Sequence, residues 1–276
     1  MNRNKCICGS EQVFKLFSLE GKNKNILKCK KCGLAWTYPP PKVDYADYDF
    51  SDHYRYKKVH QSRSKQILRL TRCFKKKGKL LELGCGPGLL LELARERGFQ
   101  VNGIDLCDAA VTNAQRLLGK DAVEKKDGTN PILQNKANDV IVMDNYLEHV
   151  ENFIQNLLDI EPLLNDRGII VICSPNIDGL YVKLMKEDSS ILKPDEHIWQ
   201  FSIKYIKHML EKIGYVPLRI KPVGFINIQL FLHELRFLVL NKRSIKIFLQ
   251  NSLNCIFGYL GCGDTFILVA RKNHEY

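Results

Sequence analysis

Short apolar runs alternate with amphipathic segments along the chain from residue 79 onward. In the amphipathic segments the apolar residues recur every three to four positions, the spacing of helices, whereas the short runs between them have the pattern of buried strands. The expected strands cover 79–83, 100–106, 122–125, 139–143, 169–173, 215–220 and 265–271. The expected helices cover 88–97, 109–118, 153–163 and 202–213. This alternation predicts an α/β fold, a mainly parallel sheet with helices on both faces.

The part of the chain before this alternation has a different pattern. Four paired cysteines occur within residues 1–41, a segment that ends in three consecutive prolines. A tyrosine-rich connector and a basic amphipathic helix follow over 42–78. The remainder, 79–276, is expected to form one α/β domain that carries an apolar insertion at 224–261. The sequence therefore predicts three parts, the first of them a small cysteine-based unit.

Composition limits the classes of function. A chain of 276 residues with 45% hydrophobic content is large enough for one such domain and a small appendage. It has neither a leading signal-like segment nor a run of about 18 uncharged apolar residues, which predicts a cytoplasmic protein. The net charge of +12 admits nucleic acid, an anionic membrane surface or a phosphorylated substrate as partner. Its densest patch, 55–79, is first interpreted as the solvated face of an amphipathic helix, with phosphate binding as the alternative.

One stretch, Leu-Glu-Leu-Gly-Cys-Gly-Pro-Gly over 81–88, carries three glycines at alternate positions between an expected strand and an expected helix. Glycine has no Cβ atom and tolerates positive φ, so such a turn brings its backbone against a bound ligand at the start of the helix. A dinucleotide-binding turn would have its third glycine at position 89, where Leu89 stands. The stretch is thus a ligand-binding turn of another kind.

This turn resembles motif I of the class I S-adenosylmethionine-dependent methyltransferases, E/D-x-G-x-G-x-G. Four further stretches are similar to the branch of that family that modifies small molecules and saccharides: 139–150, 174–176, 197–202 and 263–272. RNA-modifying branches often have Asn/Asp-Pro-Pro-Tyr after the fourth strand, whereas this chain has Asp-Asn-Tyr-Leu over 144–147. The resemblance implies a seven-stranded Rossmann-like sheet whose last two strands form a reversed hairpin.

The resemblance also implies S-adenosylmethionine as cofactor, bound beyond the carboxyl ends of the first four strands. In the family, the acid of motif I fixes the glycine loop or the cofactor's amino group. An aspartate after strand two accepts both ribose hydroxyls, and the residue next to it lies against the adenine. An aspartate after strand three accepts a hydrogen bond from the adenine amino group. The residues of this sequence expected to bind the cofactor are Glu82, Gly84, Cys85, Gly86, Gly88, Asp105, Leu106, Asp127, Gly128 and Asn145. The alternatives are a surface-turn residue for Asp105 and a plain β-turn at Asp127 and Gly128.

The cysteines near the N-terminus form two close pairs, Cys6 with Cys8 and Cys29 with Cys32, separated by enough chain for a hairpin. Four thiolates can surround Zn²⁺ tetrahedrally and close its coordination shell, so the spacing predicts a structural zinc ribbon. Free thiols are the alternative. The ribbon resembles the N-terminal segment of methyltransferases in sugar and polysaccharide pathways, which implies that it covers or shapes the substrate side of the site.

Methyl transfer to a hydroxyl or an enolisable carbon requires the removal of a proton. His149, which follows strand four, is the first candidate for the general base, and His197, before the helix at Ser202, is the second. The alternatives are a packing role for His149 and a backbone hydrogen bond for His197.

The predicted function is methyl transfer to a small molecule, with a sugar on a nucleotide or lipid diphosphate carrier as the first candidate. An RNA methyltransferase that uses the ribbon and the basic patch is one alternative, and a non-catalytic binding module is another. The insertion at 224–261 is interpreted as helices that pack on the sheet or form a dimer surface, with a lid or membrane-facing surface for a lipid-linked acceptor as the alternative.

Overall fold

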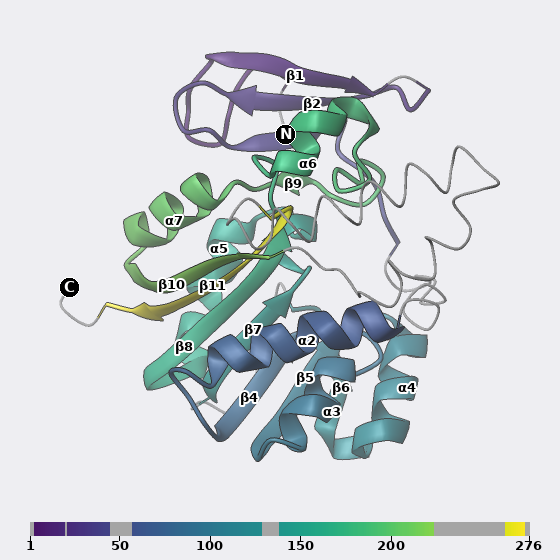
Figure 1. Cartoon of the computed structure of the whole chain (residues 1–276), viewed down its shortest axis with the longest axis vertical. Helices are drawn as coiled ribbons and strands as arrows, with labels where there is room; N and C mark the ends of the chain where they lie inside the picture. The colour runs from purple at the N-terminus through teal and green to yellow at the C-terminus, as the bar shows by residue number, and fades with distance from the viewer. Residues whose placement is uncertain (1–2, 20, 45–56, 129–137, 224–262, 274–276) are drawn as a thin grey trace.

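A seven-stranded sheet organises the larger part of the molecule (Figure 1). The computed structural model describes residues 3–19, 21–44, 57–128, 138–223 and 263–273. The strand order is β10-β11-β8-β7-β4-β5-β6, and β11 runs antiparallel to both of its neighbours while the others run parallel. The strands are β4 (Gly78–Leu83), β5 (Phe99–Asp105), β6 (Val123–Lys125), β7 (Asn138–Asp144), β8 (Leu164–Pro175), β10 (Tyr215–Val223) and β11 (Thr265–Lys272). The predicted α/β fold and its reversed last pair are confirmed.

Helices cover both faces of this sheet because successive strand residues point to opposite sides. Leu80 packs in one hydrophobic cluster with α2, α3 and α4, whereas its neighbour Leu81 packs in a second cluster with α5 and α7. The helices are α2 (Lys57–Thr71), α3 (Leu89–Arg95), α4 (Asp108–Leu118), α5 (Phe153–Asp159), α6 (Leu180–Met185) and α7 (Ile203–Lys212). Single 3₁₀ turns are η1 (Lys120–Ala122), η2 (Leu147–His149), η3 (Glu161–Leu163) and η4 (Lys186–Asp188).

The cysteine-bearing segment forms a second sheet that also includes a strand of the α/β region. Its order is β1-β2-β3-β9, all antiparallel, with β1 (Val13–Leu19), β2 (Lys24–Cys29), β3 (Ala35–Tyr38) and β9 (Trp199–Gln200). Thr37 adds two bonds beside this pairing: its N–H donates to the carbonyl of Ile198 at 2.9 Å, and its Oγ1 donates to the carbonyl of His197 at 2.7 Å. The ribbon is therefore joined by backbone pairing to the segment that carries His197.

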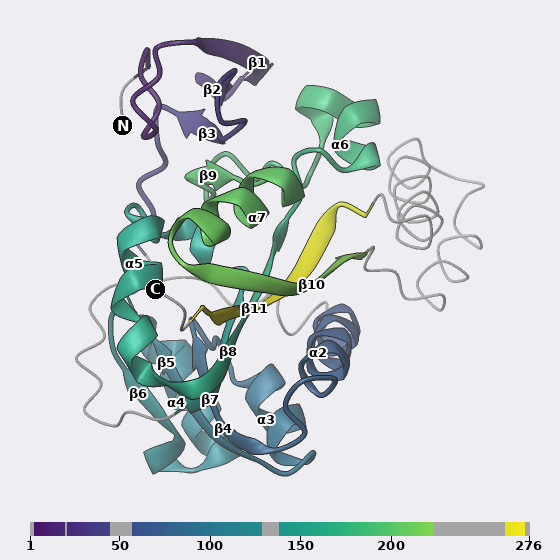
Figure 2. The same ribbon diagram turned by 90° about the vertical axis from the view of Figure 1, so that its left-hand side faces the viewer.

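The ribbon also shares a hydrophobic core with the α/β region. Leu34 and Trp36 belong to the same buried cluster as Tyr205 and Met209 of α7. Figures 1 and 2 both show β1, β2 and β3 at one end of the molecule, next to β9 and α7. Packing of this kind gives the ribbon a fixed position relative to the sheet.

Most predicted elements match observed ones to within a few residues, with three notable differences. β8 begins five residues earlier than expected, and α6 and β9 were not predicted at all. The tyrosine-rich part of the connector and the insertion at 224–261 lie outside the described residues, so the interpretations made for them stay predictions. Within the described ranges, no helix combines the length and the apolar character that a bilayer crossing needs.

Candidate active site

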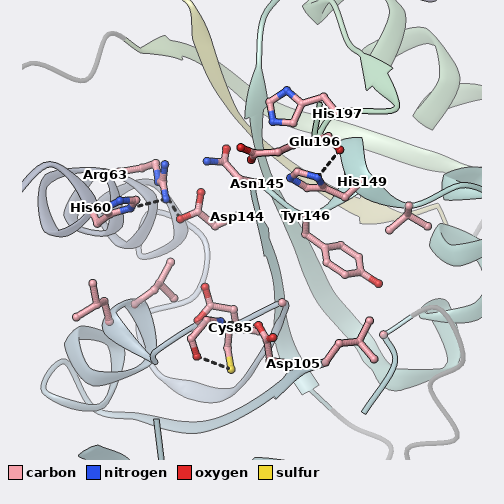
Figure 3. Close-up of a pocket in the computed structure, with 18 of the residues that line it drawn as sticks. His60, Arg63, Cys85, Asp105, Asp144, Asn145, Tyr146, His149, Glu196 and His197 are labelled. Atoms are coloured by element: carbon pink, nitrogen blue, oxygen red, sulfur yellow. Dashed lines mark hydrogen bonds and ion pairs between the residues drawn. The ribbon is translucent and has the colours of Figure 1, made fainter. Parts of the chain in front are cut away.

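A cavity of about 630 Å³ opens at the carboxyl ends of β4, β5 and β7 (Figure 3). The chain proceeds outward from β4 through β5 and β6, then returns to the other side of β4 with β7, so the strand order reverses at this point. Ligands of open α/β sheets bind at such reversals. Nine of the ten residues expected to bind the cofactor line the cavity, together with both histidine candidates.

The glycine loop needs its glycines for two different reasons. Gly84 has φ +68°, and an added Cβ atom would lie 2.9 Å from Cδ2 of Tyr146, so the ring packs against bare backbone. Gly88 has φ +84° and precedes α3; a Cβ there would lie 3.1 Å from the Cβ of Ala114 on α4. Gly88 is the one expected residue that is not part of the cavity wall. Its place in the motif allows two helices to approach each other.

Asp105 ends β5 with its carboxylate beside the glycine loop. Oδ2 accepts a hydrogen bond from the N–H of Gly86 at 2.8 Å, and Oδ1 accepts one from the N–H of Cys107 at 2.9 Å. Burial raises the pKa of Asp105, and these backbone bonds oppose that rise. A carboxylate oxygen has two lone pairs, so each one can still accept a ribose hydroxyl. The geometry fits the expected role.

Leu106, Asp127 and Gly128 line the cavity beyond Asp105. Leu106 is 39% exposed, unusual for a large apolar side chain, and offers a surface for a flat base. Gly128 lies so close to Tyr146 that an added Cβ would be 2.6 Å from the phenol oxygen. This wall is thus apolar on one side and carries a carboxylate on the other, which suits an adenine ring.

Charged side chains gather at the opposite end of the glycine loop. Glu82 is buried, its Oε2 has no hydrogen-bond partner among the described residues, and burial followed by the charge of Asp144 raises its pKa well above the usual value. Arg63 of α2 donates from Nε to Oδ2 of Asp144 at 3.0 Å and lies 3.0 Å from Nδ1 of His60 (Figure 3). Carboxylates and a guanidinium together can bind a group that carries both an ammonium and a carboxylate, such as the amino-acid end of S-adenosylmethionine.

Sequence reasoning missed Arg63, His60 and Asp144. Arg63 was assigned with its basic neighbours to a solvated helix face, and most of those neighbours are indeed exposed, among them Lys57, Lys58, Lys65, Arg69 and Arg72. Arg63 instead precedes the buried Ile67 by four residues and has a side chain that is 13% exposed. Residues four positions apart lie on the same face of a helix, so the spacing of Arg63 from Ile67 could have predicted that Arg63 is not on the solvated face.

Asn145 follows β7 with φ +51°, a conformation rare outside glycine. Its N–H donates to the carbonyl of Cys173 at 2.8 Å, which holds this turn against β8. Figure 3 shows its side chain directed into the cavity between Asp144 and the histidines. Backbone strain of this kind clusters at functional sites.

The two histidines lie together at the far end of the cavity. Their rings are 4.9 Å apart, edge to face, and Nδ1 of His149 is 3.1 Å from the carbonyl oxygen of Glu196. Burial lowers the pKa of His149 to about 4, and burial together with His149 lowers that of His197 well below its usual value. Both imidazoles are therefore neutral at pH 7 and able to accept a proton, although such a low pKa makes His149 a weak base.

Glu148 completes this end of the site and was not among the expected residues. It is buried, Oε2 accepts a hydrogen bond from Oγ of Ser174 at 3.0 Å, and Oε1 has no partner among the described residues. Burial raises its pKa to about 8. One ligand atom from each of Glu148, His149 and His197 lies within 4.8 Å of the others.

The four N-terminal cysteines converge as their spacing predicted. Sγ of Cys6 is 3.6 Å from that of Cys32, Sγ of Cys8 is 3.7 Å from that of Cys29, and all four lie within 4.8 Å of one another. A hydrogen bond from the Cys6 thiol lowers the pKa of Cys32 to about 5. A ring of four sulfur atoms of this size fits a tetrahedral divalent ion, and zinc is the ion that such ligands favour.

Comparison with known families and structures agrees with this geometry. The family model described as "Methyltransferase domain" matches residues 52–220. A solved S-adenosylmethionine-dependent methyltransferase from Archaeoglobus fulgidus is 21% identical, with a TM-score of 0.58 over 82% of this chain and all of that one. A plantazolicin methyltransferase solved with S-adenosylhomocysteine is 18% identical, with a TM-score of 0.55 over 80% of this chain and 87% of the other.

Among curated proteins, the ubiquinone biosynthesis O-methyltransferase of Rickettsia canadensis is 28% identical over 101 residues. The match covers 36% of this chain and 43% of that protein, so the chain spans less than half of the length of this relative.

Proposed function

We propose that this chain, which belongs to the methyltransferase domain family, uses S-adenosylmethionine to methylate a hydroxyl oxygen of a small molecule. The observation that carries the proposal is the division of one cavity into two ends. The end at the glycine loop offers charged and backbone groups that fit the cofactor, and the end at the histidines offers buried neutral groups to a second ligand.

The residues at the first end divide the cofactor among them. Arg63 would bind the carboxylate of the methionine part, and Glu82 would bind its ammonium, since both line the cavity. Asp105 would accept the ribose hydroxyls, while Leu106 and Asp127 would hold the adenine. When bound there, the cofactor supplies a methyl group on a sulfonium, which is already activated toward a nucleophile. What remains for the protein is to align the acceptor and to receive its proton.

The second end is suited to that work. Methylation of a hydroxyl would require a group at this end of the cavity that receives the hydroxyl proton. His149 and His197 are neutral at pH 7 because they are buried, so either can take that proton from an acceptor held between them and the cofactor. Their low pKa values mean that a group which lowers the pKa of the acceptor would assist them.

Two acceptor chemistries fall within this proposal. The sequence resemblance favours a sugar on a nucleotide or lipid diphosphate, whereas the curated relatives are named as O-methyltransferases of ubiquinone biosynthesis and favour an oxygen of a quinone precursor.

The test is a turnover screen that measures S-adenosylhomocysteine with nucleotide sugars, lipid-linked glycans, phenolic quinone precursors and RNA. Product with a small hydroxylated acceptor and none with RNA is the expected outcome. Activity confined to RNA would overturn the substrate class, and cofactor binding without turnover on any acceptor would favour the non-catalytic alternative.

We further infer that Cys6, Cys8, Cys29 and Cys32 hold one structural Zn²⁺ per chain. The four sulfur atoms close the coordination shell and leave no open position for a substrate. Its effect on the reaction would pass through the pairing of β3 with β9, next to His197. Metal analysis of the purified protein should find about one zinc per chain, lost when Cys29 and Cys32 are replaced by serine.

A further inference from the structure

Glu148, His149 and His197 form a compact group of ligand-type side chains at the acceptor end of the cavity. Two of them are adjacent in η2 and the third comes from the loop before β9, almost fifty residues later. Their ligand atoms lie within 4.8 Å of one another, and the two histidine side chains line the cavity. The group is separate from the four cysteines of the ribbon.

Two atoms in this group lack hydrogen-bond partners among the described residues. Glu148 is 1% exposed and its Oε1 is unpartnered, and His197 is 3% exposed with an unpartnered Nδ1. A buried polar atom left in this state destabilises the folded protein. A hydrogen bond between the two side chains would remove that destabilisation, yet the structure contains none. The unpartnered Oε1 of Glu148 and Nδ1 of His197 together indicate a bound group that contacts both side chains.

Each of the three residues is held by a second group. Ser174 donates from Oγ to Oε2 of Glu148 at 3.0 Å, and Thr37 of the ribbon donates to the backbone carbonyl of His197 at 2.7 Å. The carbonyl of Glu196 can only accept, so Nδ1 of His149 is the donor in their 3.1 Å contact and Nε2 carries the lone pair. Histidines that bind metals through one ring nitrogen typically donate a hydrogen bond from the other nitrogen to a group such as a backbone carbonyl.

We propose that Glu148, His149 and His197 bind a divalent transition-metal ion next to the position of the acceptor. Imidazole nitrogens suit Zn²⁺, Mn²⁺ or Fe²⁺, and three protein ligands leave coordination positions open toward the cavity. One of those positions would take the acceptor oxygen, and the positive charge would lower the pKa of that hydroxyl, so that its proton passes to water. With the ion bound, His149 and His197 would serve as ligands in place of the base role proposed above. This role for the ion rests on the proposed function, whereas the binding site itself does not.

Mn²⁺ is the probe that separates this site from the ribbon, because thiolates favour softer ions. The full-length protein is titrated with MnCl₂ in the presence of S-adenosylhomocysteine and without an acceptor, and the loss of the free Mn²⁺ electron paramagnetic resonance signal reports binding. One Mn²⁺ per wild-type chain is expected. Glu148→Gln and His197→Gln should each weaken binding at least tenfold, and Ser174→Ala, which removes only the supporting hydroxyl, by about tenfold.

His208→Gln is the matched control, since His208 is exposed on α7 and should leave Mn²⁺ affinity unchanged. Retained S-adenosylhomocysteine affinity shows that each variant is folded. If Glu148→Gln or His197→Gln does not fold, the Mn²⁺ affinity of Ser174→Ala still tests the site. No Mn²⁺ bound by the wild type, or equal affinity in the ligand variants, overturns the site. Turnover that survives chelation would likewise remove the role of the ion and leave the proposed methylation intact.

Discussion

The two ends of the cavity are built in different ways. The cofactor end takes most of its wall from one stretch of chain, 82–128, whose backbone turns and carboxylates occupy the carboxyl ends of neighbouring parallel strands. The acceptor end brings together Glu148, His149 and His197 from separate segments, one of which is paired with the ribbon. The first end is therefore fixed by the sheet itself, and the second depends on contacts between distant parts of the chain.

Their electrostatics differ as well. At the cofactor end, Arg63 is paired with Asp144, and Asp105 accepts two backbone hydrogen bonds, so these three charged groups have partners. At the acceptor end, burial keeps His149 and His197 neutral, and no cation other than Lys193 lines that side among the described residues. A cofactor with fixed charges suits the first environment, and an acceptor whose proton must leave suits the second.

The largest expected effect is on cofactor affinity. Asp105→Ala would remove two charge-assisted bonds to the ribose, each worth roughly 1.5–3 kcal/mol, and should weaken S-adenosylhomocysteine binding at least about 100-fold. Calorimetric titration measures the change. Asp108→Ala is the control, because that aspartate is exposed nearby and outside the cavity wall. Unchanged affinity in Asp105→Ala would refute the ribose assignment.

Loss of the ribbon metal should affect the acceptor end alone. Replacement of Cys29 and Cys32 by serine removes two of four ligands, and without them β3 would no longer hold β9 in register. We expect turnover to fall at least tenfold while S-adenosylhomocysteine affinity changes less than threefold. Metal content, turnover and calorimetry on the same preparation provide the measurement. An equal loss of both properties would show that the two ends are not independent.

A pair of glycine substitutions separates backbone strain from contact. Gly84 and Gly98 both have positive φ, +68° and +88°. The Cβ added in Gly84→Ala would lie 2.9 Å from Tyr146, whereas the Cβ added in Gly98→Ala would have no atom within 4 Å. Gly98→Ala should cost about 1 kcal/mol of unfolding free energy, and Gly84→Ala roughly 1–3 kcal/mol more, with weaker cofactor binding. Urea unfolding measures both, and equal costs would contradict the close packing of the loop on Tyr146.

The smallest effect is expected from Thr37→Val. Valine has nearly the shape of threonine but cannot donate to the carbonyl of His197, so about 1 kcal/mol of stability is at stake. The KM for the acceptor should rise a few-fold, with S-adenosylhomocysteine affinity within twofold of wild type. Thr37→Ser, which keeps the hydroxyl, should restore the acceptor KM. Failure of serine to do so would assign the effect to packing.

The same difference between the two ends decides what the sequence could predict. The glycine loop, Asp105 and Asp127 were found because a strand and the turn after it are contiguous in sequence, and parallel strands bring those turns together. The thiol cluster was found because ligand spacing is local. The seven strands and the reversed last pair were expected from the family resemblance, whereas the strand order comes from the structure.

The rest required contacts between distant residues. β9 is two residues long and exists because β3 pairs with it, so no local pattern indicates it. No sequence pattern sets Glu148 apart from other acidic residues, and only its burial and its hydrogen bond from Ser174 distinguish it. Arg63 was hidden among exposed basic residues on the same helix, because a composition argument treats the patch as a whole.

The most direct test of the division between the two ends is calorimetric titration of S-adenosylhomocysteine into the wild type, Asp105→Ala and His197→Gln. We expect the dissociation constant to be at least about 100-fold higher in Asp105→Ala than in the wild type. In His197→Gln it should stay within twofold of wild type, although this variant should lose turnover. A comparable loss of affinity in His197→Gln, in a protein that melts like the wild type, would contradict it.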